Sequence, residues 1–175
     1  MNKDCISTLD MENADWLSTD INGKPVVNTH KLYMNIKEKA QIRITERGNY
    51  FIFDGKVYRN ISERDLKAII KSCIPVENRK KKDWTAVYDE YQTDFPDTME
   101  DDFNADENII CFNNGVLKLD TMELTKHSDK YLVTRMVPCD YLEDKTLDDA
   151  PVFKKYLYQL VDKDPALITF LMEYM

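Results

Sequence analysis

The feature that most constrains the fold is an Asp-Gly pair between two short runs of β-prone residues. Residues 50–53 precede Asp54-Gly55, and residues 56–59 follow it. Asp-Gly is favoured in two-residue turns between antiparallel strands, because both central residues of such a turn need positive φ. The sequence therefore predicts a β-hairpin here, and the alternation of apolar and polar residues over 41–45 predicts a further strand before it.

Helical patterns flank the predicted hairpin on both sides. A helix that runs to about Lys39 is expected, with Thr29 as its N-cap. A second helix starts at Ser62, with Asp65 three residues on as a variant of the capping box, and ends before Pro75. A third helix is expected to have Asp83 as its N-cap. Its apolar stripe, at helical spacing, consists of Trp84, Val87, Tyr88 and Tyr91.

The second half of the chain repeats this mixture of short strands and helices. Strands are expected near residues 109–112, 116–119 and 131–137, with turns at 113–115 and 120–123. Helices are expected from Pro151 to about Val161 and from about Asp164-Pro165 onward. These elements predict an α+β fold with two small subdomains, each mixing short antiparallel strands or hairpins with helices.

Changes in charge and composition suggest four regions. Residues 1–25 are expected to form a loosely ordered N-terminal arm, and residues 26–95 a helix-hairpin-helix-helix subdomain. Residues 96–105 are expected to be an acidic linker, and residues 106–175 a second subdomain.

The charge of the chain is unevenly distributed. The net charge of −8 argues against a protein that coats DNA along its whole surface. Residues 56–82, however, contain nine basic and three acidic side chains, a local charge of +6, whereas residues 94–108 contain seven acidic side chains and no basic one. The candidate DNA-binding residues are Lys56, Arg59, Lys67, Lys71, Arg79, Lys80, Lys81 and Lys82.

Two interpretations of this basic segment are open. In the first, the lysines and arginines neutralise phosphates while Tyr50, Phe51, Phe53 and Tyr58 stack on unpaired bases. In the second, Lys67 and Lys71 form an ordinary solvated helix face and the four aromatic residues are half core. DNA binding is expected to be weak, to favour single-stranded or forked DNA, and to depend on residues 79–82.

The sequence gives no sign of a catalytic or cofactor site. The four glycines, Gly23, Gly48, Gly55 and Gly115, are isolated, and no G-x-x-x-x-G-K-[ST] motif is present. The cysteines form no C-x-x-C pair, and the paired acidic residues fall in predicted loops or at helix ends. We expect no catalytic residue, no metal and no cofactor. A hydrolase or nuclease that uses the acidic loops is the weakest alternative.

The last predicted helix is apolar on more than one side. It has no glycine or polar tail at its end, and such a helix is normally buried against a partner. The expected interaction residues are Phe170, Leu171 and Tyr174, and the expected contact is self-association or another protein. There is no apolar run long enough for a membrane helix and no signal sequence, so we expect a cytoplasmic protein without membrane contact.

The order of motifs from residue 106 onward carries a family resemblance. Residues 108–119 contain Asn113-Asn114-Gly115 between apolar runs. Glu123-Leu124, His127-Ser128 and residues 137–141, from Val137 to Tyr141, follow it. This arrangement resembles the D5-type N-terminal domain of phage and plasmid primase-helicases of the P4 class, which precedes a superfamily 3 helicase motor. The likeness covers about residues 106–175, with a weaker part reaching back to the hairpin at residues 53–58.

The resemblance implies a role without catalysis. It suggests an accessory region of a primase-helicase that supports DNA replication in a bacterium or a phage-infected cell. The implied partners are DNA and the helicase motor or another replication protein. The alternative is a standalone protein-interaction module, or an inhibitor, that binds a replication helicase, a primase or a host factor.

Overall fold

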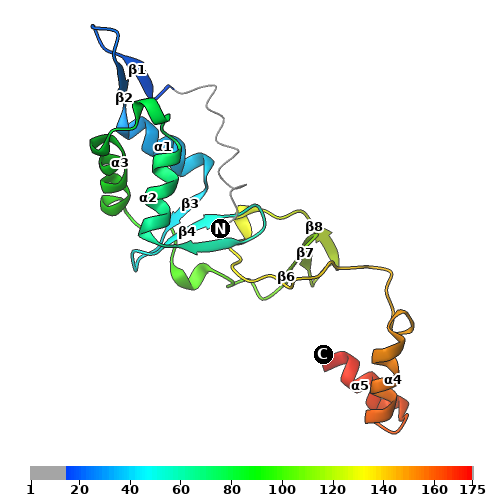
Figure 1. Cartoon of the computed structure of the whole chain (residues 1–175). Helices are drawn as coiled ribbons and strands as arrows, with labels where there is room; N and C mark the ends of the chain where they lie inside the picture. The colour runs from blue at the N-terminus through cyan, green and yellow to red at the C-terminus, as the bar shows by residue number, and fades with distance from the viewer. Residues whose placement is uncertain (1–14, 175) are drawn as a thin grey trace. The chain divides into compact units, whose positions relative to one another are not determined.

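The computed structural model describes residues 15–174, and side chains as far as Met172 (Figure 1). The chain divides between Asp140 and Tyr141 into two compact units. The described residues combine five α-helices with three small antiparallel sheets. The predicted α+β class with small subdomains is therefore confirmed.

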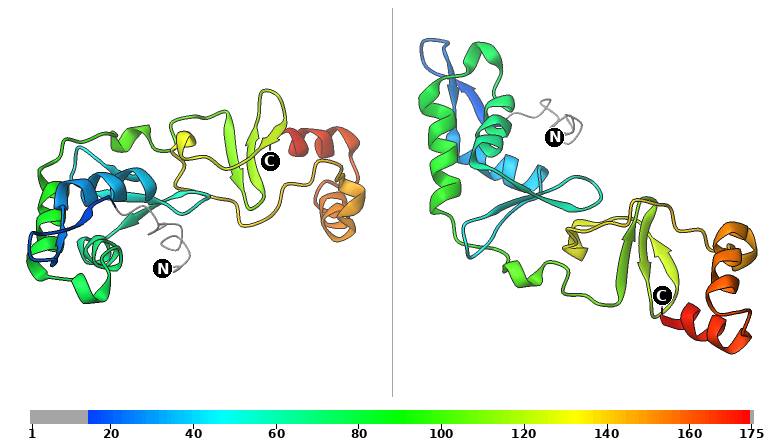
Figure 2. Two further views of the ribbon diagram at one scale, coloured as in Figure 1. Left: turned by 90° about the horizontal axis from the view of Figure 1, so that it is seen from above. Right: turned by 60° about the horizontal axis from the view of Figure 1, so that its bottom comes forward.

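The largest core lies between one sheet and three helices. The sheet has the strand order β3 (Ile42–Ile44), β4 (Tyr50–Phe53), β5 (Tyr58–Ile61). One face of it packs on α1 (Thr29–Lys39), α2 (Glu63–Ser72) and α3 (Lys81–Thr93), which lie together in Figure 2. The shared interior is apolar, because alternate strand residues and one stripe of each helix point inward. Its most deeply buried members include Leu32, Ile36, Leu66, Ile70 and Val87.

The predicted hairpin exists, but its turn is longer than expected. β4 and β5 pair with Phe53 opposite Tyr58, so residues 54–57 form the connection. The Asp54 carboxylate accepts hydrogen bonds from the backbone N–H groups of Lys56 and Val57, each at 2.9 Å. Of the expected two-residue turn, only Gly55 has positive φ. Val57 is fully buried in a second core, which explains why the strand starts two residues late.

Of the three predicted N-caps, the structure confirms only Ser62. Ser62 and Asp65 form the predicted capping box of α2, with Ser62 Oγ accepting from the Asp65 N–H at 3.2 Å. For α1 the N-cap is Asn28 and not Thr29, and its side chain accepts from the Lys31 N–H at 3.0 Å. The prediction of Asp83 as N-cap was also wrong, because α3 begins earlier, after Lys80, and Asp83 is buried in its first turn.

A second sheet lies further along the chain, with the order β6 (Ile109–Phe112), β7 (Gly115–Lys118), β8 (Glu123–Thr125). The third strand was expected as a turn, while the strand expected over residues 131–137 is absent. Leu132 has a φ of 47°, which interrupts an extended strand. Its neighbour Val133 instead accepts a hydrogen bond from the Tyr58 N–H at 2.7 Å, and Val137 makes a single bridge to Phe112.

A short hairpin precedes α1, although no strands were expected before residue 41. It consists of β1 (Leu17–Thr19) and β2 (Pro25–Val27). Trp16 belongs to the main core, and its carbonyl accepts from the Asn28 N–H at 2.7 Å. The rest of the expected N-terminal arm, residues 1–14, lies outside the described residues.

The acidic segment after α3 is attached to the first sheet. The backbone N–H of Asp97 donates to the Ile44 carbonyl at 3.0 Å, and the Asp97 carboxylate accepts from the Ile44 N–H at 3.0 Å. The short 3₁₀ turn η4 (Glu100–Asp102) follows, and Phe103 packs on Phe51 with ring centroids 4.4 Å apart. Whether the ranges 26–95 and 106–175 fold independently stays a prediction.

The unit after residue 140 is a pair of helices, α4 (Pro151–Leu160) and α5 (Pro165–Tyr174). Pro151 lies in the first turn of α4, as predicted. The Asp164 carboxylate accepts from the Ala166 N–H at 2.9 Å at the start of α5. The remaining 3₁₀ turns are η3 (Val76–Asn78), η5 (Asp129–Tyr131) and η6 (Leu147–Asp149).

Candidate nucleic-acid interface

Five lysines lie on α2 and at the start of α3, which pack together; Lys67 and Lys71 are half-buried, and Lys80, Lys81 and Lys82 are exposed. The Lys67 Nζ lies 4.0 Å from the centroid of the Tyr88 ring, and the Lys71 Nζ lies 4.1 Å from that of Trp84. Each ammonium group is attracted by the negative face of the ring below it. Lys67 also pairs with Glu63 at 3.3 Å. We call Lys67, Lys71, Lys80, Lys81 and Lys82 the basic face.

The three consecutive lysines lie at the start of α3. Lys80 is the N-cap residue and makes no side-chain capping hydrogen bond, and Lys81 and Lys82 occupy the first helical turn. All three are exposed. Cations are unfavourable at a helix N-terminus, because the helix dipole already places positive charge there. The same combination of lysines and unsatisfied N–H groups attracts an anion such as phosphate.

Arg79 has a structural task beside this face. Its guanidinium donates two hydrogen bonds to the Ile74 carbonyl, from Nη2 at 2.9 Å and from Nε at 3.3 Å. Ile74 is fully buried just after α2. Arg79 thus fixes the connection between α2 and α3, which the sequence did not indicate.

Lys56 and Arg59 belong to a different surface, the β4–β5 hairpin. The Arg59 Nε pairs with the Asp54 carboxylate at 2.8 Å. Burial would raise the pKa of Asp54, but the Val57 N–H and Arg59 together lower it below its usual value. Lys56 and Arg59 lie on the hairpin, whereas Lys80 to Lys82 lie at the start of α3. The structure therefore brings together only part of the predicted DNA-binding set.

Of the four aromatic residues of the hairpin, two are core residues and two are half-buried. Tyr50 and Tyr58 are buried, and Phe53 packs against Tyr58 with centroids 5.4 Å apart. Phe51 lies against Phe103. The four rings are thus half core, as the second interpretation expected, while DNA contact through the lysines stays a prediction.

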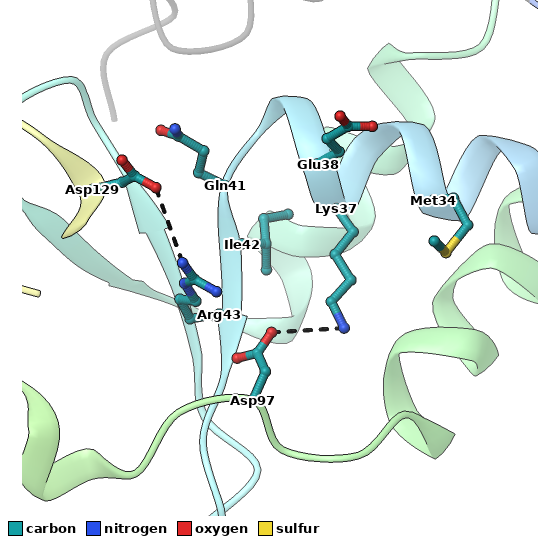
Figure 3. A pocket seen from close by; sticks show the side chains of 8 residues that line it. All are labelled: Met34, Lys37, Glu38, Gln41, Ile42, Arg43, Asp97 and Asp129. Atoms are coloured by element: carbon teal, nitrogen blue, oxygen red, sulfur yellow. Dashed lines mark ion pairs between the residues drawn. The ribbon is translucent and has the colours of Figure 1, made fainter.

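A charged pocket that the sequence did not indicate lies beside the outer edge of β3 (Figure 3). It has a volume of about 370 Å³. Two ion pairs cross it: Lys37 Nζ to Asp97 at 3.6 Å and Arg43 Nη2 to Asp129 at 4.0 Å. The lining residues are Met34, Lys37, Glu38, Gln41, Ile42, Arg43, Asp97 and Asp129.

The charges in this pocket hold chain segments together. Lys37 also pairs with Asp94, which in turn accepts a hydrogen bond from the Tyr33 hydroxyl. Burial would raise the pKa of Asp94, but the hydrogen bonds from Lys37 and Tyr33 lower it. Burial and the bond to Asp94 raise the pKa of Tyr33 to about 12. The lining has two cations, Lys37 and Arg43, against three carboxylates, so the pocket offers no surplus positive charge to a nucleic acid.

Residues of the Asn-Asn-Gly and His-Ser motifs stabilise the second sheet and its connections. A Cβ atom on Gly115 would lie 2.4 Å from the Thr125 carbonyl oxygen, so β7 and β8 approach closely only because this residue is glycine. The His127 Nε2 lies 2.8 Å from the Phe112 carbonyl oxygen, at the end of β6. The Asn113 N–H donates to the Cys139 carbonyl at 2.9 Å.

The α4–α5 pair exposes most of its apolar side chains. Of the predicted interaction residues, Phe170 is half exposed and Leu171 is partly buried, while the side chain of Tyr174 lies outside the described ones. Leu157 alone is fully buried among the described residues of this unit. The exposed apolar residues are Leu142, Val152, Phe153, Tyr156, Leu160, Leu167, Phe170 and Met172.

The described residues 15–174 contain neither a cluster of metal ligands nor a membrane-spanning helix. Within this range no three His, Cys, Asp or Glu side chains are grouped so as to hold a metal ion. The helices of the same range are too short or too polar to cross a membrane.

Comparison with known proteins identifies the family of the chain from a match over most of its length. No curated protein sequence matches it. A family model described as D5 N-terminal-like matches residues 13–162. The match takes in both three-stranded sheets, the basic face and α4, and so begins much earlier than the resemblance at residues 106–175 suggested. The chain belongs to the D5 N-terminal-like family.

Proposed function

We propose that this protein is a non-catalytic accessory region of a phage or plasmid primase-helicase, which supports DNA replication by contacting DNA and by helping the helicase to assemble. Family membership associates the chain with such primase-helicases. The observation that carries the DNA contact is the basic face, where five lysines lie on two packed helices.

The proposed contact is with the phosphate backbone. Phosphate contacts hold a protein on DNA without reading its sequence. Lys67 and Lys71 lie over the Tyr88 and Trp84 rings, so bases would have to displace them in order to stack there. Few phosphates can be neutralised by one local face on a chain of charge −8. We therefore expect weak, salt-sensitive binding with a preference for single-stranded or forked DNA.

The DNA contact is tested by changing Lys80, Lys81 and Lys82 to Gln. The binding of a fluorescent forked oligonucleotide, followed by anisotropy at low salt, should be lost. Arg79 is kept, because its hydrogen bonds to the Ile74 carbonyl support the fold. A matched control changes three exposed lysines on other segments, Lys126, Lys155 and Lys163, to Gln. Equal affinity of the two triple variants would refute the proposed interface.

A second candidate function, a protein-interaction module, is favoured by the α4–α5 pair. This unit has about 35 residues, and its described side chains as far as Met172 include one fully buried apolar residue, Leu157. It is smaller than most chains that fold stably alone. We propose that its exposed apolar residues are covered by a second copy of this chain, as in the assembly of a helicase ring. The superfamily 3 motor and other replication proteins are the alternative occupants.

Sedimentation of the purified chain tests this second surface. Phe170→Asp should shift the protein toward the monomer, because a carboxylate would then be buried without a partner. Thr169→Asp, at the neighbouring exposed position of α5, is the control and should leave the association unchanged. A monomer at high concentration before any substitution would exclude a second copy as the occupant.

A further inference from the structure

The turn between β1 and β2 presents an apolar side chain at a fixed position. Ile21 is fully exposed at this turn. The Asp20 carboxylate accepts from the N–H groups of Asn22 and Lys24, both at 2.8 Å. The Asp20 backbone is also bonded to Gly23 and Lys24, at 3.0 and 2.8 Å, and Gly23 adopts a φ of 74°. These hydrogen bonds order the backbone of the turn on both sides of Ile21.

The base of this hairpin is anchored in the main core. Trp16, just before β1, is buried there, and its carbonyl accepts from the Asn28 N–H just after β2. The hairpin projects from the body beyond α1 in Figures 1 and 2. An isolated exposed isoleucine is common on protein surfaces. One that is held out on an anchored, hydrogen-bonded turn can enter a partner at a lower cost, because the backbone of the turn is already ordered.

The charges of the segment that β2 contacts suit a partner that carries phosphate. β2 contacts η3, which leads through Arg79 into the three lysines at the start of α3. Lys24 lies on the turn itself, directly before β2. Five cations, Lys24 and residues 79–82, therefore stand against two carboxylates, Asp20 and Glu77. The Asp20 carboxylate is already engaged by the backbone of its own turn.

We propose that the β1–β2 turn is a wedge that inserts Ile21 at the junction between single-stranded and duplex DNA, while the lysines of the basic face hold the adjoining phosphates. This inference rests on the proposed DNA contact. Apolar side chains are known to enter base steps and to unstack them partly. A junction suits such a side chain, because its terminal base pair is stacked on one side only. The wedge therefore gives the chain a reason to prefer forks over uniform DNA.

The test uses the whole chain and a forked oligonucleotide with 2-aminopurine at the junction base pair, whose fluorescence rises on unstacking. The protein should raise this fluorescence, and Ile21→Ser should remove the rise and weaken fork binding severalfold. Binding to unforked single strands should be unchanged. Ile21→Leu should retain the rise, and Val76→Ser, which removes an exposed apolar side chain from neighbouring η3, should have no effect.

The outcomes separate this wedge from the DNA contact on which it rests. If the unsubstituted chain binds no DNA, both proposals are overturned. If it binds, and Ile21→Ser keeps both the fluorescence rise and the fork affinity, the wedge alone is wrong. A variant that binds forks normally but loses self-association in sedimentation would show that the turn contacts protein. Circular dichroism confirms that Ile21→Ser retains the fold, as its complete exposure predicts.

Discussion

The body around the first sheet and the α4–α5 pair are built from similar residues but differ in how they are buried. In the body, three helices and a sheet enclose a continuous apolar core. In the helix pair, Leu157 is 1% exposed while Val152 is 83% exposed. Apolar side chains are thus buried together in the body, whereas most of those described in the helix pair are exposed to solvent. The body encloses its own core, and the exposure of the apolar residues in the described part of the helix pair supports the proposal that a partner covers them.

The largest expected effect comes from the core of the body. Ile70→Ala should lower the free energy of unfolding by about 2–5 kcal/mol, because Ile70 is completely buried between the helices. Val152→Ala, on exposed α4, should change it by less than about 0.5 kcal/mol. Urea denaturation measures both. Similar losses for the two variants would mean that the helix pair is as fully packed as the body.

Removal of the α2 capping box should have a smaller effect. Ser62→Ala should cost about 1 kcal/mol, because the N–H of Asp65 loses its acceptor in a helix that supplies much of the core. Thr29→Ala is a useful comparison, since the structure assigns the cap of α1 to Asn28. It should therefore cost less than Ser62→Ala in the same denaturation experiment. The reverse order would contradict the assigned helix starts.

The free energy of unfolding of the body should depend on pH through the ionisation of Asp94. Its pKa is lowered in the folded state, so its ionised form stabilises the fold above the unfolded carboxyl pKa of about 3.9. This contribution is lost as the pH falls through the lower folded pKa. Asp94→Asn should therefore have a lower free energy of unfolding than the natural chain at neutral pH. The difference between the two free energies should narrow below about pH 4. A difference that stays constant with pH would show that ionisation of Asp94 is not the cause.

The smallest effect is expected at the basic face. Lys71→Gln should lower stability by only about 0.5–1 kcal/mol, through loss of the ammonium group over Trp84. In a Trp84→Leu background the same substitution should have almost no effect. A double-mutant cycle separates the contribution of this contact from that of packing. Coupling near zero would mean that Lys71 does not rest on the ring.

The elements that could be predicted from the sequence are those determined by interactions between residues close together in the chain. The Ser62–Asp65 capping box and the stripe that includes Val87 and Tyr91 are local patterns, and the structure has both. The β4–β5 hairpin was also found, but its register was not. The register depends on the burial of Val57 in a core contributed by residues more than fifty positions away.

The site was less predictable for the same reason. The run of charge at residues 79–82 marked the start of α3, but nothing in the sequence indicated that Arg79 binds the Ile74 carbonyl. The pocket that pairs Arg43 with Asp129 joins segments distant along the chain. Ile21 belongs to a hairpin of two three-residue strands, and strands this short leave little periodicity to detect.

The most direct test of the basic face as the DNA contact is the salt dependence of fork binding. The slope of log affinity against log salt counts the phosphates that the protein neutralises, at about 0.7 per contact on single strands. Lys80, Lys81 and Lys82 changed together to Gln should make the slope shallower by about 2, while Phe170→Asp leaves the slope per chain unchanged. An unchanged slope in the lysine variant would contradict the account.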